Sequence, residues 1–359
     1  MWQAHLSACI MRIGGIPMMI KVVALFILVS CFIPALFAQE YDQLVMEASS
    51  RMLDSDYQAA LDLYRQAFMA EEGDVFDLYN AACAAAVCDS PDAAFMYLEK
   101  AANSILVEKE WLEEDEDLLS LHSDNRWFTL LASIDSRIDS VLTSLPEEHP
   151  QGPVIELPQP RLSSDVSVEE AMQNRRSIRF YEDSPLTITE VSQLLWSAYG
   201  LSYPVENAPD FLRGGLRTAP SAGALYPLDL YLVARNVTDL DPGIYLYRSE
   251  THELILIAGE YSWEEFSNAG FNQLHFETAA AAIVYSAVFE RCTDIYGDRG
   301  AERYVCMDLG HSAENIYLQA YALNIGTCAI GAFSDLALKQ VIRMTRAEVP
   351  LYIMPLGKV

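Results

Sequence analysis

Residues 174–180 of the chain read Asn-Arg-Arg-Ser-Ile-Arg-Phe, directly after a short helical pattern. Three guanidinium groups and one hydroxyl therefore fall within five positions, on Arg175, Arg176, Ser177 and Arg179. The planar guanidinium fork matches phosphate oxygens two at a time and stays charged at physiological pH. The cluster thus indicates a site for one phosphate group. The alternative is a solvated basic helix end that complements the helix dipole.

A second stretch, residues 217–227, combines small side chains with prolines and reads Arg-Thr-Ala-Pro-Ser-Ala-Gly-Ala-Leu-Tyr-Pro. It runs into an apolar strand pattern at 228–233. Small side chains let a flat ring approach the backbone, and exposed amides in such a loop can form hydrogen bonds with the ring. The stretch is therefore a candidate binding loop for a planar group.

Together and in this order, the two stretches resemble the nitroreductase family of FMN-dependent oxidoreductases, and in particular its SagB-type branch. The resemblance covers roughly residues 160–359. It implies an α+β, nitroreductase-like FMN-binding fold, in which helices flank an antiparallel-dominated sheet. It also implies a homodimer with FMN at the interface, a small-molecule substrate, and hydride transfer through the flavin N5.

The family's motifs imply FMN-binding roles for particular residues. The arginine motif, which holds the phosphate in the family, falls on Arg175, Arg176, Ser177 and Arg179. The small-residue loop would line the isoalloxazine ring from the partner subunit, through Pro220, Ser221, Ala222, Gly223 and Ala224. Residues 329–333 resemble the family's late glycine turn near the flavin, which implies roles for Ile330 and Gly331. The alternative there is a buried strand end with a glycine turn. Lys358 stands where the family often has a basic residue near the phosphate.

One position departs from the SagB pattern. Azoline-forming members carry a Lys-Tyr pair before a glycine, whereas this chain has Ile295 and Tyr296 before Gly297. The missing lysine would have removed a proton during hydride transfer, so thiazole or oxazole formation is not expected. Tyr296 is predicted to be a proton donor, and the alternative is a tyrosine that only packs.

The helix and strand patterns of residues 161–359 agree with an α+β fold. Capping boxes at Ser167 and Thr187 predict helices over 168–174 and 187–200. Two further helices are predicted over 303–324 and 335–343. Apolar runs predict strands at 228–236, 244–248, 253–258, 280–288, 327–332 and 351–356, with a hairpin between 243 and 258.

Residues 39–145 are predicted to form a separate all-helical domain. The segment 59–67 matches 93–101, and the offset between the two equals the period of tetratricopeptide repeats. Short repeat domains of this kind bind peptides or partner proteins, and the alternative is an adaptor that packs on the second domain. Five prolines between 146 and 160 indicate a stiff linker. The FMN domain is therefore expected at 161–359.

Residues 1–38 have the features of a targeting segment. Lys21 precedes an unbroken apolar run over 22–37, which is short for a membrane span, and Ala38 suits signal peptidase. A cleaved signal would export the protein from a bacterial cytoplasm. The alternatives are a lipoprotein anchored through Cys31 and an uncleaved membrane anchor.

The overall charge and the cysteines exclude some classes of partner. A net charge of −28 argues against nucleic acid, because phosphate backbones need a basic surface. The seven cysteines show no metal-like spacing, so no metal site is expected. Two functions remain: the flavin enzyme, and a protein-interaction module whose repeats bind a partner beside a non-catalytic flavin scaffold. The intact arginine cluster and small-residue loop favour the enzyme.

Overall fold

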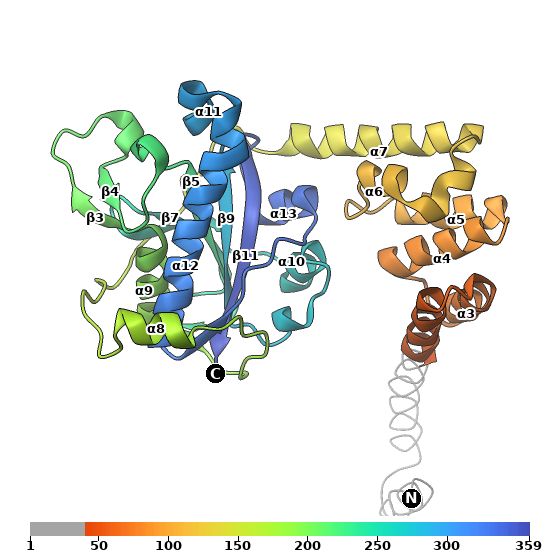
Figure 1. Ribbon diagram of the computed structural model, residues 1–359, viewed down its shortest axis with the longest axis horizontal. Helices are drawn as coiled ribbons and strands as arrows, with labels where there is room; N and C mark the ends of the chain where they lie inside the picture. Colours follow the sequence, from red (N-terminus) through yellow and green to blue (C-terminus); the bar gives the residue numbers. More distant parts are fainter. Residues whose placement is uncertain (1–39) are drawn as a thin grey trace, which may run out of the picture. The chain divides into compact units, whose positions relative to one another are not determined.

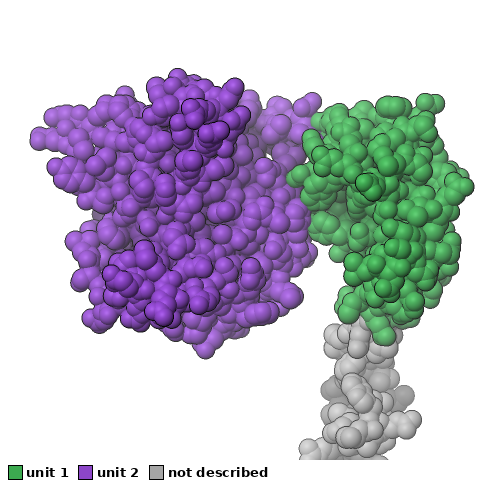
Figure 2. All heavy atoms as spheres, in the orientation of Figure 1, with its two compact units in different colours: residues 1–135 green, residues 136–359 purple. Residues whose placement is uncertain are grey.

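The computed structural model describes residues 40–359, which form two compact units (Figures 1 and 2). One unit ends at Asp135, and the other covers Ser136–Val359. The predicted targeting segment, residues 1–38, lies outside the described residues. Within residues 40–359, no helix is long and apolar enough to cross a membrane.

Residues 40–135 form helices and no strand, as the sequence predicts. After a helical stretch over 40–53 come α3 (Tyr57–Ala70), α4 (Val75–Val87), α5 (Pro91–Ala101), α6 (Lys109–Glu114), a 3₁₀ helix (Glu116–Leu121) and the start of α7 (Asn125–Ser144). The alanine-rich α4 contacts both α3 and α5, and the small side chains allow close helix packing. α3 begins at Tyr57 and α5 at Pro91, so one predicted repeat period separates their starts. This spacing agrees with the repeat that the sequence predicts, and the tetratricopeptide assignment itself stays a prediction.

A seven-stranded antiparallel sheet forms the centre of the second unit. Its order is β1-β8-β7-β5-β9-β11-β10. The strands are β1 (Val154–Glu156), β5 (Leu228–Ala234), β7 (Gly243–Arg248), β8 (Glu253–Ala258), β9 (Ala281–Val288), β10 (Ile325–Thr327) and β11 (Glu348–Lys358). Every residue of the central strand β5 is buried, which explains its unbroken apolar pattern around a single acid, Asp229.

Helices cover both faces of this sheet (Figure 1). α9 (Ile188–Tyr199) and α12 (Cys306–Ala322) lie on one face, and α10 (Trp263–Ala269) and α13 (Asp335–Ile342) lie on the other. Ser312 joins the layers, because its hydroxyl donates to the carbonyl of Ala198 at 2.7 Å and lies 2.8 Å from the hydroxyl of Tyr285 on β9. The smaller elements are α8 (Val168–Asn174), α11 (Glu290–Tyr296), the pair β2 (Leu186–Thr187) and β6 (Val237–Thr238), the pair β3 (Leu201–Pro204) and β4 (Gly215–Arg217), and the 3₁₀ turns Asp210–Leu212, Ala222–Ala224 and Leu274–Phe276. The predicted α+β fold is confirmed.

Some boundaries differ from those predicted. The strand predicted over 327–332 ends at Thr327, and only an isolated bridge between Ile330 and Ile353 continues its pairing with β11. The N–H of Ala329 points away from β11 and donates to the hydroxyl of Tyr317. The helix predicted over 303–324 starts as an α-helix only at Cys306, after a π-helical segment, Gly300–Val305. α10 and α11 were not predicted, since seven residues are too few for a periodic signal. α10 does begin with a capping signal, Ser262 and Glu265, like the one that predicted α8.

The proline-rich stretch 146–160 contains a strand of the sheet. β1 pairs with β8 at the sheet edge, and the carbonyl of Pro153 accepts the N–H of Leu256 at 2.9 Å. An edge strand needs partners on one side only, so prolines beside it are tolerated. Residues 154–156 therefore belong to the second unit and not to a linker.

Candidate active site

The arginine cluster lies at the C-terminal end of α8. The side chain of Ser167 accepts the N–H of Glu170 at the start of this helix, and Arg175 ends it. Nη1 of Arg176 donates to the carbonyl oxygens of Gln173 (3.0 Å) and Arg175 (2.7 Å). Arg176 thus caps the helix, as the alternative interpretation of the cluster expects.

The other two arginines of the cluster, Arg175 and Arg179, are not paired with an acid in the described part of the chain. None of the ion pairs found in residues 40–359 involves Arg175 or Arg179, and Arg179 is exposed. Lys358 is different, because it is bound to Glu190. Burial alone would raise the pKa of Glu190, but the hydrogen bonds from Lys358 and Thr187 hold it below its ordinary value. The basic group predicted from position 358 is therefore already neutralised.

Tyr317 of α12 joins the arginine cluster to the glycine turn. The guanidinium carbon of Arg175 lies 5.1 Å from the centre of the Tyr317 ring, and Oγ of Ser177 lies 3.2 Å from the Tyr317 hydroxyl. The same hydroxyl accepts the N–H of Ala329 at 2.7 Å. The structure therefore brings the cluster and residues 329–331 together.

Ile330 and Gly331 differ in what they offer a ligand. Ile330 is buried, donates its N–H to the carbonyl of Ile353 at 2.9 Å and accepts the N–H of Ile353 at 3.0 Å. This is the buried strand end of the alternative interpretation. Gly331 is exposed and follows directly. Of the two, Gly331 is the residue whose backbone a ligand can reach.

The small-residue loop is held at the other end of α12. Oγ of Ser221 accepts the N–H of Tyr226 at 2.9 Å, and the carbonyl of Ser221 accepts the N–H of Ala224 at 3.0 Å. The N–H of Ala222 donates to Oδ1 of Asp308 at 3.3 Å. Several polar groups predicted to face a flavin are thus engaged within the chain. Their role is to shape the loop.

Tyr296 lies against this loop at Gly223. Gly223 is exposed and has a φ of 63°, a region that favours glycine. A Cβ at this position would lie 2.6 Å from the hydroxyl oxygen of Tyr296. The Tyr296 ring packs edge-on against Tyr304, with 4.9 Å between the ring centroids. The predicted proton donor and the predicted ring-binding loop therefore meet.

A cavity of about 610 Å³ opens beside this contact. Its lining is mixed: apolar or neutral side chains lie next to three acids and two arginines. The lining residues are Asp210, Phe211, Arg213, Gly223, Leu225, Glu290, Arg291, Asp294, Ile295 and Tyr296. A cavity of this size accommodates a small organic molecule.

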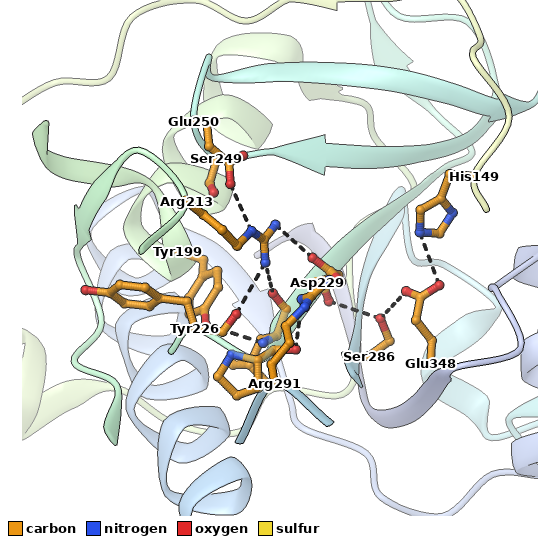
Figure 3. Close-up of polar contacts among 12 residues, drawn as sticks. His149, Tyr199, Arg213, Tyr226, Asp229, Ser249, Glu250, Ser286, Arg291 and Glu348 are labelled. Atoms are coloured by element: carbon orange, nitrogen blue, oxygen red, sulfur yellow. Dashed lines mark hydrogen bonds and ion pairs between the residues drawn. The ribbon is translucent and has the colours of Figure 1, made fainter. Parts of the chain in front are cut away.

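An ion network fixes the C-terminal end of the loop (Figure 3). Asp229 of β5 binds Nη2 of Arg213 at 3.0 Å and Nη2 of Arg291 at 2.8 Å. Burial alone would raise the pKa of Asp229, but the two guanidinium groups lower it below its ordinary value. Arg213 also donates to the carbonyl of Tyr226 (3.3 Å), and Arg291 donates to that of Pro227 (3.2 Å). The loop is thereby tied to β5 and α11.

Arg217, at the start of the loop, is a structural arginine. Its side chain is fully buried. The guanidinium carbon lies 4.3 Å from the ring centre of Tyr226 and 5.1 Å from that of Tyr199. Nη2 binds Glu250 at 2.9 Å and Oγ of Ser249 at 3.0 Å. The charge of Arg217 is therefore used to hold the loop and is not available to a ligand.

The two predicted halves of the FMN site lie at different places along α12. Asp308 contacts the loop, and Tyr317, nine residues later, contacts the arginine cluster. With a rise of about 1.5 Å per residue, about 13 Å of helix separates them. The phosphate ligands and the ring loop therefore lie at a separation that an FMN molecule can span.

The residues present fit FMN at both of these places. Beside the arginine cluster, the carbonyl of Thr327 accepts the N–H of Ile178 at 2.9 Å, and the buried Oγ1 of Thr327 has no hydrogen-bond partner among the described residues. Unpaired guanidinium groups and an unsatisfied hydroxyl suit a phosphate. At the loop, Gly223 is exposed and lines the cavity of about 610 Å³, which gives a flat ring access to the backbone there.

Sequence reasoning missed Asp308 and Tyr317. Asp308, Ser312 and Ile316 recur every four residues and are all buried, so an acid on the apolar face of a helix was a usable signal. No comparable pattern marks Tyr317, which is only partly buried. Its role depends on three segments that are distant from it in the sequence.

The model of the nitroreductase family matches residues 172–358, slightly more than half of the chain. The chain belongs to the nitroreductase family. It is 38% identical, over 194 residues, to the provisionally named nitroreductase MJ1384 of Methanocaldococcus jannaschii. That match covers 54% of this chain and 92% of the archaeal protein.

The chain also resembles a crystal structure of a provisionally named nitroreductase from Anabaena variabilis, with 27% identity and a TM-score of 0.50. The likeness covers 60% of this chain and 44% of that one, so less than half of the cyanobacterial chain is matched. These relationships confirm the predicted nitroreductase-like enzyme, whose family typically binds FMN. The family match begins at residue 172, and the helical first unit lies outside it.

Proposed function

We propose that the protein is an exported, FMN-dependent oxidoreductase that transfers hydride through the flavin N5 to or from a small organic substrate. The arginine cluster is the observation that carries this proposal. Arg175 and Arg179 have no carboxylate partner in the described chain, whereas Arg217 and Arg291 are bound to acids. Guanidinium groups kept free of acids are suited to bind a phosphate group.

We further propose that FMN lies between two copies of the chain. The phosphate would bind the arginine cluster of one copy, and the ring would lie on the loop of the other. The resemblance to the nitroreductase family is the ground for this arrangement, and the length of helix between Asp308 and Tyr317 is one that an FMN molecule can span.

A complementation experiment tests this shared site. One chain carries Arg175→Ala with Arg179→Ala, and the other carries Gly223→Val, which places a side chain where the Tyr296 hydroxyl lies. If each site draws on both chains, every mixed dimer contains one unaltered site and one doubly altered site. Mixing the two inactive proteins under subunit exchange should therefore restore FMN binding. No restoration, although exchange is verified by mass spectrometry, would show that the ligands come from one chain.

Bound flavin would supply the hydride chemistry, and the chain would bind and orient it. We propose that the arginine cluster holds the phosphate, that the loop and Gly331 face the ring, and that the Tyr296 hydroxyl gives a proton to the substrate. Tyr296→Phe should lower turnover and leave FMN affinity unchanged. Tyr304→Phe is the matched control, because the Tyr304 ring packs on Tyr296. Full turnover of every accepted substrate by Tyr296→Phe would exclude the proton-donor role.

Export and partner binding complete the proposal. We infer that residues 1–38 direct the protein out of the cytoplasm, with lipid attachment at Cys31 as the alternative, and that the helical repeats bind a protein partner. The apolar run over 22–37 and the repeat-like spacing of α3 and α5 support these inferences. Mass spectrometry of the mature N-terminus distinguishes the routes: cleavage before Gln39 supports a secretory signal, and a lipid-modified Cys31 supports the anchor.

A further inference from the structure

Asp308 is a buried carboxyl group directly behind the small-residue loop. It lies in the first turn of α12, and only 1% of it is exposed. Oδ1 accepts the N–H of Ala222 at 3.3 Å. Oδ2 is also buried, and it has no hydrogen-bond partner in the part of the chain that the structure describes. One oxygen thus holds the loop while the other is unsatisfied.

The surroundings of Asp308 do not neutralise a negative charge. The loop, α11, α9 and α12 itself supply the groups that face it, which are Ser221, Ala222, Cys292, Tyr199 and His311. None of these is a lysine or an arginine, and no salt bridge to Asp308 is found within residues 40–359. Burial raises the pKa of Asp308, and the hydrogen bonds from Ser221 and Ala222, with the nearby His311, offset only part of this effect.

Asp229 shows what a buried acid needs in order to stay ionised in this fold. Its two oxygens bind Arg213 at 3.0 Å and Arg291 at 2.8 Å, and its pKa is lowered although burial opposes this. Asp308 is likewise buried and has no such partner among the described residues. A buried carboxylate without a cation is the group that takes up a proton when negative charge is added nearby.

We propose that Asp308 is a positioning residue for the ring loop, and that its Oδ2 takes one proton from solvent when the flavin held against that loop is reduced. This inference rests on the proposed function. The organic electron donor supplies two electrons and one proton as hydride, so negative charge increases at the ring. The ionised Asp308 then becomes a carboxylic acid by binding a solvent proton, and releases it when the flavin is reoxidised.

Uptake of this proton should change how the reduction potential of the flavin depends on pH. One extra proton per two electrons makes the potential fall more steeply with pH in the range where Asp308 titrates. Asp308→Asn is neutral at every pH, and its amide oxygen can still accept the Ala222 N–H. The potentials of wild type and Asp308→Asn should therefore coincide at low pH. At high pH the wild type should lie lower, because an ionised Asp308 disfavours the reduced flavin.

The test is spectroelectrochemical titration of the flavin-loaded protein at a series of pH values from acidic to alkaline. Asp308→Asn is compared with the wild type and with Asp77→Asn. Asp77 is a matched control, since it is also buried (8% exposed), burial raises its pKa to about 6, and it lies in the helical first unit. We expect the wild type and Asp77→Asn to show the steeper slope and Asp308→Asn to lose it.

A second measurement needs no variant. Infrared difference spectra of the wild type, reduced minus oxidised, should gain the carbonyl band of a protonated carboxyl group. If the potential of the wild type has the same pH slope as that of Asp308→Asn, the inference is overturned and the proposed flavin enzyme is unaffected. If Asp308→Asn does not retain its flavin, the infrared spectrum of the wild type decides, and the absence of the carboxyl band overturns the inference. A wild type that binds no FMN would instead remove the proposed function, and the inference with it.

Discussion

The two ends of α12 use arginine in opposite ways. At the Tyr317 end, Arg175 and Arg179 have no acid beside them within the described residues, and Arg179 is exposed. At the Asp308 end, Arg213 and Arg217 are bound to Asp229 and Glu250 and hold the loop from within. The number of arginines is therefore a poor guide to a binding site. What distinguishes a ligand-binding arginine from a structural one is whether an acid already neutralises it.

The largest effect is expected when Asp229, the acid at the loop end of α12, is removed. Asp229→Ala removes the buried carboxylate that Arg213 and Arg291 share, which leaves Arg291 without an acid among the described residues and Arg213 with Glu250 alone. We expect the free energy of unfolding to fall by about 3–5 kcal/mol. Urea titration followed by tryptophan fluorescence measures the loss. A fall below about 1 kcal/mol would contradict a structural role for Arg213 and Arg291.

The same clamp has a predicted pH dependence. The pKa of Asp229 is lowered in the folded protein, so its contribution to stability is present above the ordinary aspartate pKa of about 3.9 and is lost as pH falls through the folded value. The stability deficit of Asp229→Ala should accordingly be full at neutral pH and should shrink in strong acid. A deficit that is independent of pH would mean that packing, not charge, causes it.

Removing an arginine without an acid partner at the Tyr317 end should weaken FMN binding and leave stability nearly unchanged. Arg179→Ala should weaken FMN binding about 10- to 150-fold, the equivalent of about 1.5–3 kcal/mol for hydrogen bonds to a charged group. Stability should stay within about 0.5 kcal/mol, because Arg179 is exposed. Arg343→Ala, at an exposed arginine that follows α13, is the control and should change neither quantity. Unchanged FMN affinity for Arg179→Ala would contradict the phosphate assignment.

The contact between the loop and Tyr296 can be tested with a single methyl group. Gly223→Ala should cost about 1–2 kcal/mol, because alanine is disfavoured at a φ of 63° and its Cβ would displace the Tyr296 hydroxyl. Gly331→Ala is the matched control, since its Cβ would meet Tyr352 at an ordinary 3.8 Å. Thermal unfolding of both variants makes the comparison. Equal losses of stability in the two variants would show that the backbone and contacts of Gly223 do not require glycine.

The smallest effect is expected within the arginine cluster itself. Arg176→Ala should lower FMN affinity by less than about fivefold, or about 1 kcal/mol, because its Nη1 already donates to two carbonyl groups at the end of α8. Fluorescence quenching of added FMN measures the affinity. A loss as large as that of Arg179→Ala would mean that Arg176 leaves the helix end to bind the phosphate.

Local sequence signals predicted the parts of the fold that local chemistry determines. The capping box of Thr187 and Glu190 begins α9 and Gly200 ends it, as expected, and β7 and β8 form the predicted hairpin. Both predicted binding motifs are located on loops. Lys358 shows the limit of this reasoning, because Glu190, 168 positions away, occupies its charge.

The remaining parts of the site depend on contacts between distant segments. Tyr317 contacts Arg175, Ser177 and Ala329, and no spacing in the sequence predicts these three contacts. The clamp of Asp229 likewise joins β5, α11 and the turn before β4. Pairing of this kind is set by the packing of the whole domain, so the sequence could indicate which arginines exist but not which were free.

The cofactor itself provides the most direct test of the central claim. The purified protein should be yellow and should release about one FMN per chain on denaturation, and the double variant Arg175→Ala with Arg179→Ala should be colourless at the same stability. A colourless wild type that also fails to bind added FMN would contradict the account. The helical repeats and their partner would then become the functional part of the molecule.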